Sequence, residues 1–70
     1  MNLEKLNPTQ VTEALAKGGH ELTVTDVEFK GYTTRGVARY IVYFQGQDDT
    51  ETIVAFVENV PGVGIVADFS

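Results

Sequence analysis

The sequence predicts an α+β domain in which one N-terminal helix packs on a four-stranded antiparallel sheet, a meander with strand order 1-2-3-4. The segment 7–19 carries signals for both the start and the end of a helix. Beyond His20, apolar residues follow the two-residue period of strands in four stretches separated by short turns. Short turns join neighbouring antiparallel strands, which gives the meander. With 70 residues and no cysteine, the chain 1–70 is expected to form a single small domain without disulfides.

The helix is predicted over Pro8–Lys17. Asn7 is a typical N-cap because its side chain can accept a free backbone N–H, and Gln10 stands where a capping box has Glu or Gln. The pair Gly18-Gly19 supplies a left-handed stop. A helix of this length is marginal in isolation, so it needs a sheet to pack against. The buried stripe of the helix is expected to consist of Val11 and Leu15 with Ala14 beside them, and Leu6 is expected to pack on Val11 as a hydrophobic staple.

Four strands are expected to follow the helix. The first ends before Gly31 and contains a β-bulge near Thr25-Asp26, because the apolar alternation changes parity there. A turn bracketed by glycines occupies residues 31–36. The remaining strands are predicted over Val37–Gln45, Glu51–Glu58 and Val63–Phe69, with turns over 46–49 and 59–62.

The turns set the expected cross-strand register. We expect Gly31 to lie opposite Gly36 in the first hairpin and Gln45 to lie opposite Thr50 in the second. Both pairings put the same apolar set on one face of the sheet, which we expect to lie under the helix. This set consists of Val27, Phe29, Ala38, Tyr40, Val42, Phe44, Ile53, Ala55 and Val57.

The fourth strand has two candidate registers. A four-residue turn would send Ile65, Ala67 and Phe69 to the outer face. A five-residue turn would send them under the helix instead, with Val66 and Asp68 outside. The second register is preferred because it keeps the charged Asp68 off the helix side.

The face away from the helix is also apolar, which predicts a binding partner. One short helix can cover only one face, yet this second face has an apolar centre surrounded by polar residues. The alternative is a sheet that twists until it half closes and buries part of this face on itself. The residues predicted to bind a partner are Arg39, Ile41, Tyr43, Val54, Phe56 and Val66.

The last strand is expected to be an unguarded edge. The segment 63–69 has no lysine and no internal proline to protect its open N–H and C=O groups. A second copy of the chain would be the simplest strand to pair with it. Alternatively, the N-terminal segment covers this edge, or Gly62 and Gly64 twist it away.

Basic residues gather around the first hairpin and suggest a second kind of site. Lys30, Arg35 and Arg39 are three of the five basic residues, and Tyr32 lies among them. Such a group could bind an anionic ligand or single-stranded nucleic acid, with the tyrosine as a stacking surface. The competing interpretation is a solvated turn with one ion pair between Glu28 and Arg39.

No pattern in the sequence specifies a catalytic, cofactor or metal site. His20 is the only histidine, and nothing fixes a nucleophile and an orienting acid beside it. Asp48 and Asp49 with Glu51 could hold a hard cation, but Asp-rich turns are common for backbone reasons. We therefore expect no enzymatic activity, no cofactor and no metal.

The leading hypothesis is a non-enzymatic protein-interaction module, expected to be homodimeric, whose partner is itself or another protein. The net charge of −5 disfavours nucleic-acid binding. The absence of cysteine and of a long apolar run favours a cytoplasmic protein with no membrane partner. A third hypothesis is an acidic competitor of a nucleic-acid-binding protein. Its acids would be Asp48, Asp49, Glu51, Glu58 and Asp68, lined up on one side.

Overall fold

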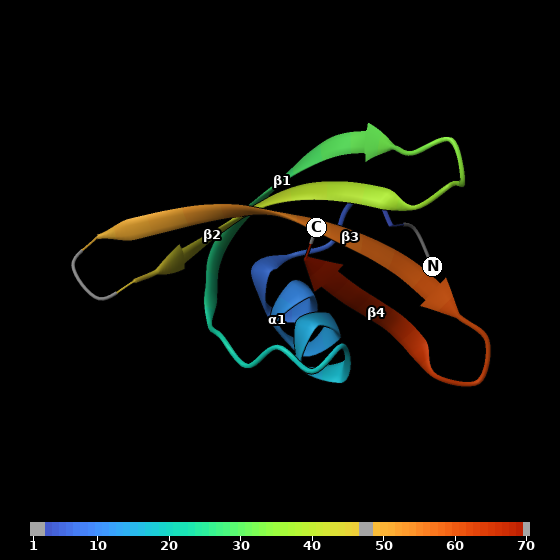
Figure 1. Cartoon of the computed structure of the whole chain (residues 1–70), viewed down its shortest axis with the longest axis horizontal. Coiled ribbons are helices and arrows are strands. Elements are labelled where there is room, and N and C mark those ends of the chain that lie inside the picture. The colour runs from blue at the N-terminus through green and yellow to red at the C-terminus, as the bar shows by residue number, and fades with distance from the viewer. Residues whose placement is uncertain (1–2, 47–48, 70) are drawn as a thin grey trace.

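One helix packs on one face of a four-stranded antiparallel sheet (Figure 1). The structure is a computed structural model, and it describes residues 3–46 and 49–69. The strand order is β1-β2-β3-β4, so the predicted α+β fold and meander are confirmed. The elements are α1 (Pro8–Lys17), β1 (Val24–Tyr32), β2 (Ala38–Gln45), β3 (Thr50–Val60) and β4 (Gly64–Phe69).

The helix α1 has the bounds and both end structures that the sequence predicts. Asn7 Oδ1 accepts the N–H of Gln10 at 2.8 Å, and Gln10 Oε1 accepts the N–H of Asn7 at 2.9 Å, which completes the capping box. At the other end, Gly19 has a φ of +90° and the N–H of His20 donates to the Leu15 carbonyl at 2.8 Å. Local side-chain and backbone bonds therefore fix both ends of this helix.

The core lies between α1 and the inner face of the sheet, by which we mean the face that α1 covers. Tyr40 is 1% exposed, and its hydroxyl accepts the N–H of Leu6 at 3.2 Å and donates to the Leu3 carbonyl. The polar end of this buried ring therefore ties the N-terminal segment to the sheet. The predicted inner set is confirmed. Its fully buried members are Ala38, Tyr40, Val42, Ala55 and Val57, and Val27, Phe29, Phe44 and Ile53 pack against them.

The first hairpin has the predicted bulge and a second one that was not predicted. The pairing of β1 with β2 shifts between Val24 and Asp26, as expected, and shifts again between Phe29 and Gly31. The expected pairing of Gly31 with Gly36 is therefore wrong, and Gly31 lies opposite Arg39 instead. Gly31 has a φ of +107°, which L side chains rarely adopt, so the glycine permits a bulge inside the strand rather than opening the turn.

This second bulge lengthens β1 and shortens the turn. The strand continues through Tyr32, and the N–H of Thr33 donates to the Val37 carbonyl at 2.8 Å. The Thr33 hydroxyl accepts the N–H groups of Arg35 and Val37, both at 3.2 Å. The turn is thus built around a threonine side chain, which offers the backbone a local partner.

The other two hairpins place their residues on the predicted faces. Gln45 lies opposite Thr50, as expected. The β3–β4 connection has only residues 61–63, so it is shorter than either turn considered from the sequence. Val57 lies opposite Ala67, which is the parity of the preferred register, and Asp68 is exposed on the other face.

Candidate protein interface

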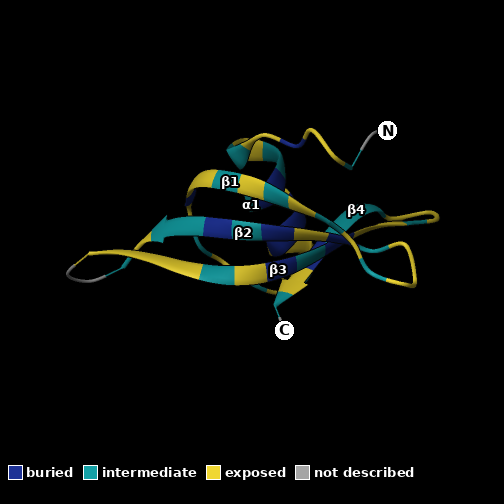
Figure 2. Ribbon diagram, turned by 90° about the horizontal axis from the view of Figure 1, so that it is seen from above, coloured by how far each residue is buried: buried dark blue, intermediate teal, exposed yellow. Residues whose placement is uncertain are grey.

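The outer face of the sheet, away from α1, is formed mainly by β2, β3 and β4. Figure 2 views the sheet with β1, β2 and β3 in front of α1, and buried and less buried residues alternate along the strands. The twist of the sheet does not bury this face on itself, because Val54 at its centre is 38% exposed. All six residues predicted to bind a partner have side chains on the outer face: Arg39, Ile41, Tyr43, Val54, Phe56 and Val66.

Direct cross-strand pairs build the apolar centre of the outer face. Ile41 lies opposite Val54, and Arg39 lies opposite Phe56. On its other side Phe56 lies opposite Asp68. Ile41 and Phe56 are half-buried, so part of each apolar side chain remains in contact with water. An apolar centre with charged neighbours is the usual composition of a protein-binding surface.

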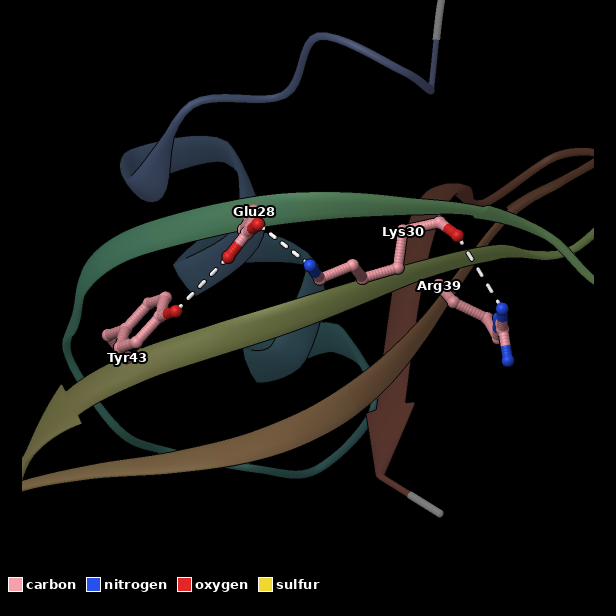
Figure 3. A network of polar contacts seen from close by, with 4 residues as sticks. All are labelled: Glu28, Lys30, Arg39 and Tyr43. Carbon is pink, nitrogen blue, oxygen red and sulfur yellow. Dashed lines mark hydrogen bonds and ion pairs between the residues drawn. The ribbon is translucent and has the colours of Figure 1, made fainter.

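A small polar network stands at the β1 side of the outer face (Figure 3). Lys30 Nζ donates to Glu28 Oε1 at 2.7 Å, and the Tyr43 hydroxyl donates to Glu28 Oε2 at 3.2 Å. These contacts lower the pKa of Glu28, with the Lys30 hydrogen bond as the largest cause, and raise the pKa of Lys30. The expected ion pair between Glu28 and Arg39 is therefore wrong. The first hairpin pairs Tyr32 with Ala38, and in the resulting register Glu28 lies opposite Ile41.

Arg39 lies on the outer face beside the apolar centre, opposite Phe56, and its charge is not neutralised by a described residue. Its Nη2 donates only a long hydrogen bond, 3.5 Å, to the Lys30 carbonyl. Among the residues that the structure describes, Arg39 forms no ion pair. Together with Lys30, Ile41 and Val54 it lines a hollow of about 270 Å³. A guanidinium beside exposed apolar groups can still bind a carboxylate or stack on an aromatic ring.

A larger hollow of about 640 Å³ lies between the β1–β2 turn and β4. It brings Arg35, expected in an anion site, together with Phe56 and Val66, expected in a protein interface. Sequence reasoning missed this combination because it depends on how the sheet twists across three strands. The hollow is lined by Thr33, Thr34, Arg35, Val37, Phe56, Glu58, Val66, Ala67 and Asp68.

The four residues expected to bind an anion do not come together. Lys30 and Arg39 meet on the outer face, and Arg35 lies in the turn. Tyr32 lies opposite Ala38 on the inner face, where its ring contacts Phe29 with centroids 5.3 Å apart. Desolvation raises the pKa of Tyr32, and the nearby carboxylate of Glu4 raises it further. The tyrosine cannot stack a ligand bound by the three cations because it lies on the opposite face.

The end of α1 packs against β4 at Ala67. A Cβ atom built on Gly18 would lie 2.1 Å from the Ala67 carbonyl oxygen. A Cβ atom built on Gly64 would lie 3.2 Å from Lys17 Nζ. Figure 1 shows α1 beside β4. The helix end thus packs against β4 at Ala67, and an unguarded edge along 63–69 stays a prediction.

His20 and Asp68 form a hydrogen bond beside the hollow of about 640 Å³. His20 Nε2 lies 2.5 Å from Asp68 Oδ1, and the imidazole packs on the Phe69 ring with centroids 4.6 Å apart. The His20 hydrogen bond is the largest cause that lowers the pKa of Asp68, and the N–H of Phe69 adds to it. These contacts give the only histidine of the chain a structural partner.

The acidic residues are divided between the two faces. Glu58 and Asp68 lie on the outer face, whereas Glu51 lies opposite Phe44 on the inner face. Asp49 Oδ1 accepts the N–H of Thr50 at 2.7 Å. Asp48 lies outside the described residues, so the proposed cation turn is only partly covered by the structure. Among the described residues, no three His, Asp or Glu side chains are grouped to hold a metal ion.

Comparisons with known protein families, with characterised proteins and with solved structures find no match to this chain. Within the described ranges, no helix combines the length and apolarity that crossing a membrane requires. The geometry of the outer face is therefore the basis for proposing a function.

Proposed function

We propose that the protein is a non-enzymatic interaction module that binds another protein surface through the outer face of its sheet. The observation that carries the proposal is the exposure of Val54, which is 38% exposed at the centre of an apolar set that α1 leaves uncovered. Removing such surface from water is favourable by about 25 cal/mol per Å². A partner that covers Val54 and its neighbours would gain this free energy.

The charged residues around this centre would give the interaction its specificity. Arg39, Glu58 and Asp68 lie next to Phe56, two of them as its direct cross-strand neighbours. Charges at the margin of an interface select among partners and accelerate association. The cytoplasmic location favoured by the sequence remains a prediction.

The test substitutes Val54 and compares it with a matched valine elsewhere. Val54→Lys places an ammonium group in the apolar centre, whereas Val63→Lys changes a 56%-exposed valine in the β3–β4 turn. Each tagged variant is used for affinity capture and for light scattering, with thermal unfolding as the control for folding. We expect Val54→Lys to lose bound protein and Val63→Lys to keep it. Equal binding by both variants would contradict the proposal.

Binding of an anionic ligand at the first hairpin is the second candidate. It is favoured by Arg35 and Arg39, neither of which forms an ion pair with a described residue. It is disfavoured by Glu58 and Asp68, whose carboxylates line the same hollow as Arg35. Titration with nucleotides and short oligonucleotides tests it. A salt-sensitive signal that Arg35→Ala removes would support it, and no response would eliminate it.

A further inference from the structure

Both strand cations of the outer face lie on β1 and β2, and β1 also places the acids Asp26 and Glu28 on this face. Lys30 of β1 and Arg39 of β2 form the basic side. Glu58 of β3 and Asp68 of β4 form the acidic side. Lys30 is paired with Glu28, and Arg35 lines the same hollow as the two acids of the acidic side. Arg39 is therefore the strand cation that forms no ion pair with a described residue.

The apolar centre is balanced about the line between β2 and β3. Ile41 on β2 lies opposite Val54 on β3, two aliphatic side chains of similar size. Arg39 on β2 lies opposite Phe56 on β3, and guanidinium and aromatic groups attract one another. Suppose that the outer faces of two copies stack and that a two-fold axis runs parallel to the strands, above the line between β2 and β3 and midway between the two sheets. Each residue of β2 would then contact, in the second copy, the β3 residue that it pairs with in its own chain.

We propose that the outer face binds a second copy of this chain, related by a two-fold axis parallel to the strands between β2 and β3. This inference rests on the proposed function and names its partner. Ile41 of each copy then packs on Val54 of the other, and Arg39 stacks on Phe56 of the other. Lys30 faces Asp68 across the interface. Arg39 of each copy then lies near Glu58 and Asp68 of the other, and each of these contacts forms twice.

The contacts of Arg39 support this arrangement over the alternatives. In one chain its guanidinium has a single 3.5 Å bond to a carbonyl oxygen, which leaves most of its donors without a protein partner among the described residues. In the second copy it would reach the Phe56 ring with carboxylates beside it. A two-fold axis perpendicular to the strands would instead place β2 on β2 and bring like charges together, which costs free energy.

The test exchanges the charges of Arg39 and Glu58. In a homodimer, Arg39→Glu alone would set its new carboxylate near Glu58 of the other copy, and Glu58→Lys alone would set its new ammonium group near Arg39. We expect each single variant to weaken self-association by about tenfold or more, because like charges then meet twice. In a dimer of one Arg39→Glu chain and one Glu58→Lys chain, position 39 of each copy still meets an opposite charge at position 58 of the other. The same holds for the double variant. Both should therefore associate more tightly than either single variant, although the loss of Arg39 stacking on Phe56 leaves them weaker than the unmodified chain.

Lys5→Glu and Glu21→Lys make the same changes in net charge at exposed positions outside the sheet, and they should leave self-association unchanged. Mass by light scattering is the readout. A monomeric unmodified chain whose outer face captures a different protein would overturn this inference and leave the proposed function standing. A dimer whose mixed single variants do not associate would overturn the axis. A monomer that captures nothing would overturn both.

Discussion

Gly18 lies so close to Ala67 that the carbonyl oxygen of Ala67 occupies the space where a side chain at position 18 would begin. A Cβ there would be 2.1 Å from that oxygen, although the Gly18 backbone has an ordinary φ of −82°. The contact joins the end of α1 to β4, the last strand of the sheet. It fixes the end of the helix against β4 at Ala67.

Gly18→Ala tests this contact. The new methyl group collides with backbone, which cannot rotate away as a side chain can, so we expect a loss of about 1–3 kcal/mol in the free energy of unfolding. Ala16→Ser, two residues earlier at an exposed helix position, should change it by less than about 0.5 kcal/mol. Urea unfolding measures both. If Gly18→Ala is as stable as the native chain, the end of α1 is not in close contact with the Ala67 carbonyl.

Tyr40→Phe tests the anchoring of the N-terminal segment. The variant removes the group that accepts the N–H of Leu6 and donates to the carbonyl of Leu3. Leaving these backbone groups without a partner in a buried site costs about 1–3 kcal/mol. The rate of hydrogen exchange at the Leu6 amide should increase by more than the loss in the global free energy of unfolding predicts.

Tyr43→Phe is the matched control for Tyr40→Phe. The Tyr43 hydroxyl bonds only the exposed carboxylate of Glu28, so its loss should cost less than about 0.5 kcal/mol. Equal effects of the two variants would argue against the role of Tyr40 as an anchor.

The hydrogen bond between His20 and Asp68 predicts the direction of a pH effect. Because the pKa of Asp68 is lowered below its ordinary value of 3.8 in the folded chain, its contribution to stability is present above the unfolded pKa. It is lost as the pH falls through the lowered folded pKa. In His20→Ala, the pKa of Asp68 should rise toward 3.8. An NMR titration of the Asp68 carboxyl carbon measures the shift, and an unchanged midpoint would show that His20 does not cause it.

The helix could be predicted from the sequence because its determinants are local. Asn7 and Gln10 bond one another across a single turn, and Gly19 supplies the stop. The two faces of β2 and β3 could be predicted because side chains alternate strictly along a strand. Both kinds of information are contained within a few neighbouring residues.

Other features depend on the whole sheet and could not be predicted in the same way. Gly31 could signal either a turn or a bulge, and only its pairing with Arg39 decides between them. The close approach of Gly18 to the Ala67 carbonyl depends on the angle at which α1 crosses a twisted sheet. The hollow that joins Arg35 to Val66 likewise combines residues of two distant hairpins.

The proposed pairing of two outer faces is tested by intermolecular nuclear Overhauser effects in a mixture of isotope-labelled and unlabelled chains. Isotope filtering separates contacts between copies from contacts within one chain. We predict signals from the Ile41 methyl groups of one copy to the Val54 methyl groups of the other, and from Arg39 to the Phe56 ring. Spectra in which the outer face gives no intermolecular signal, while a dimeric mass is observed, would contradict the account.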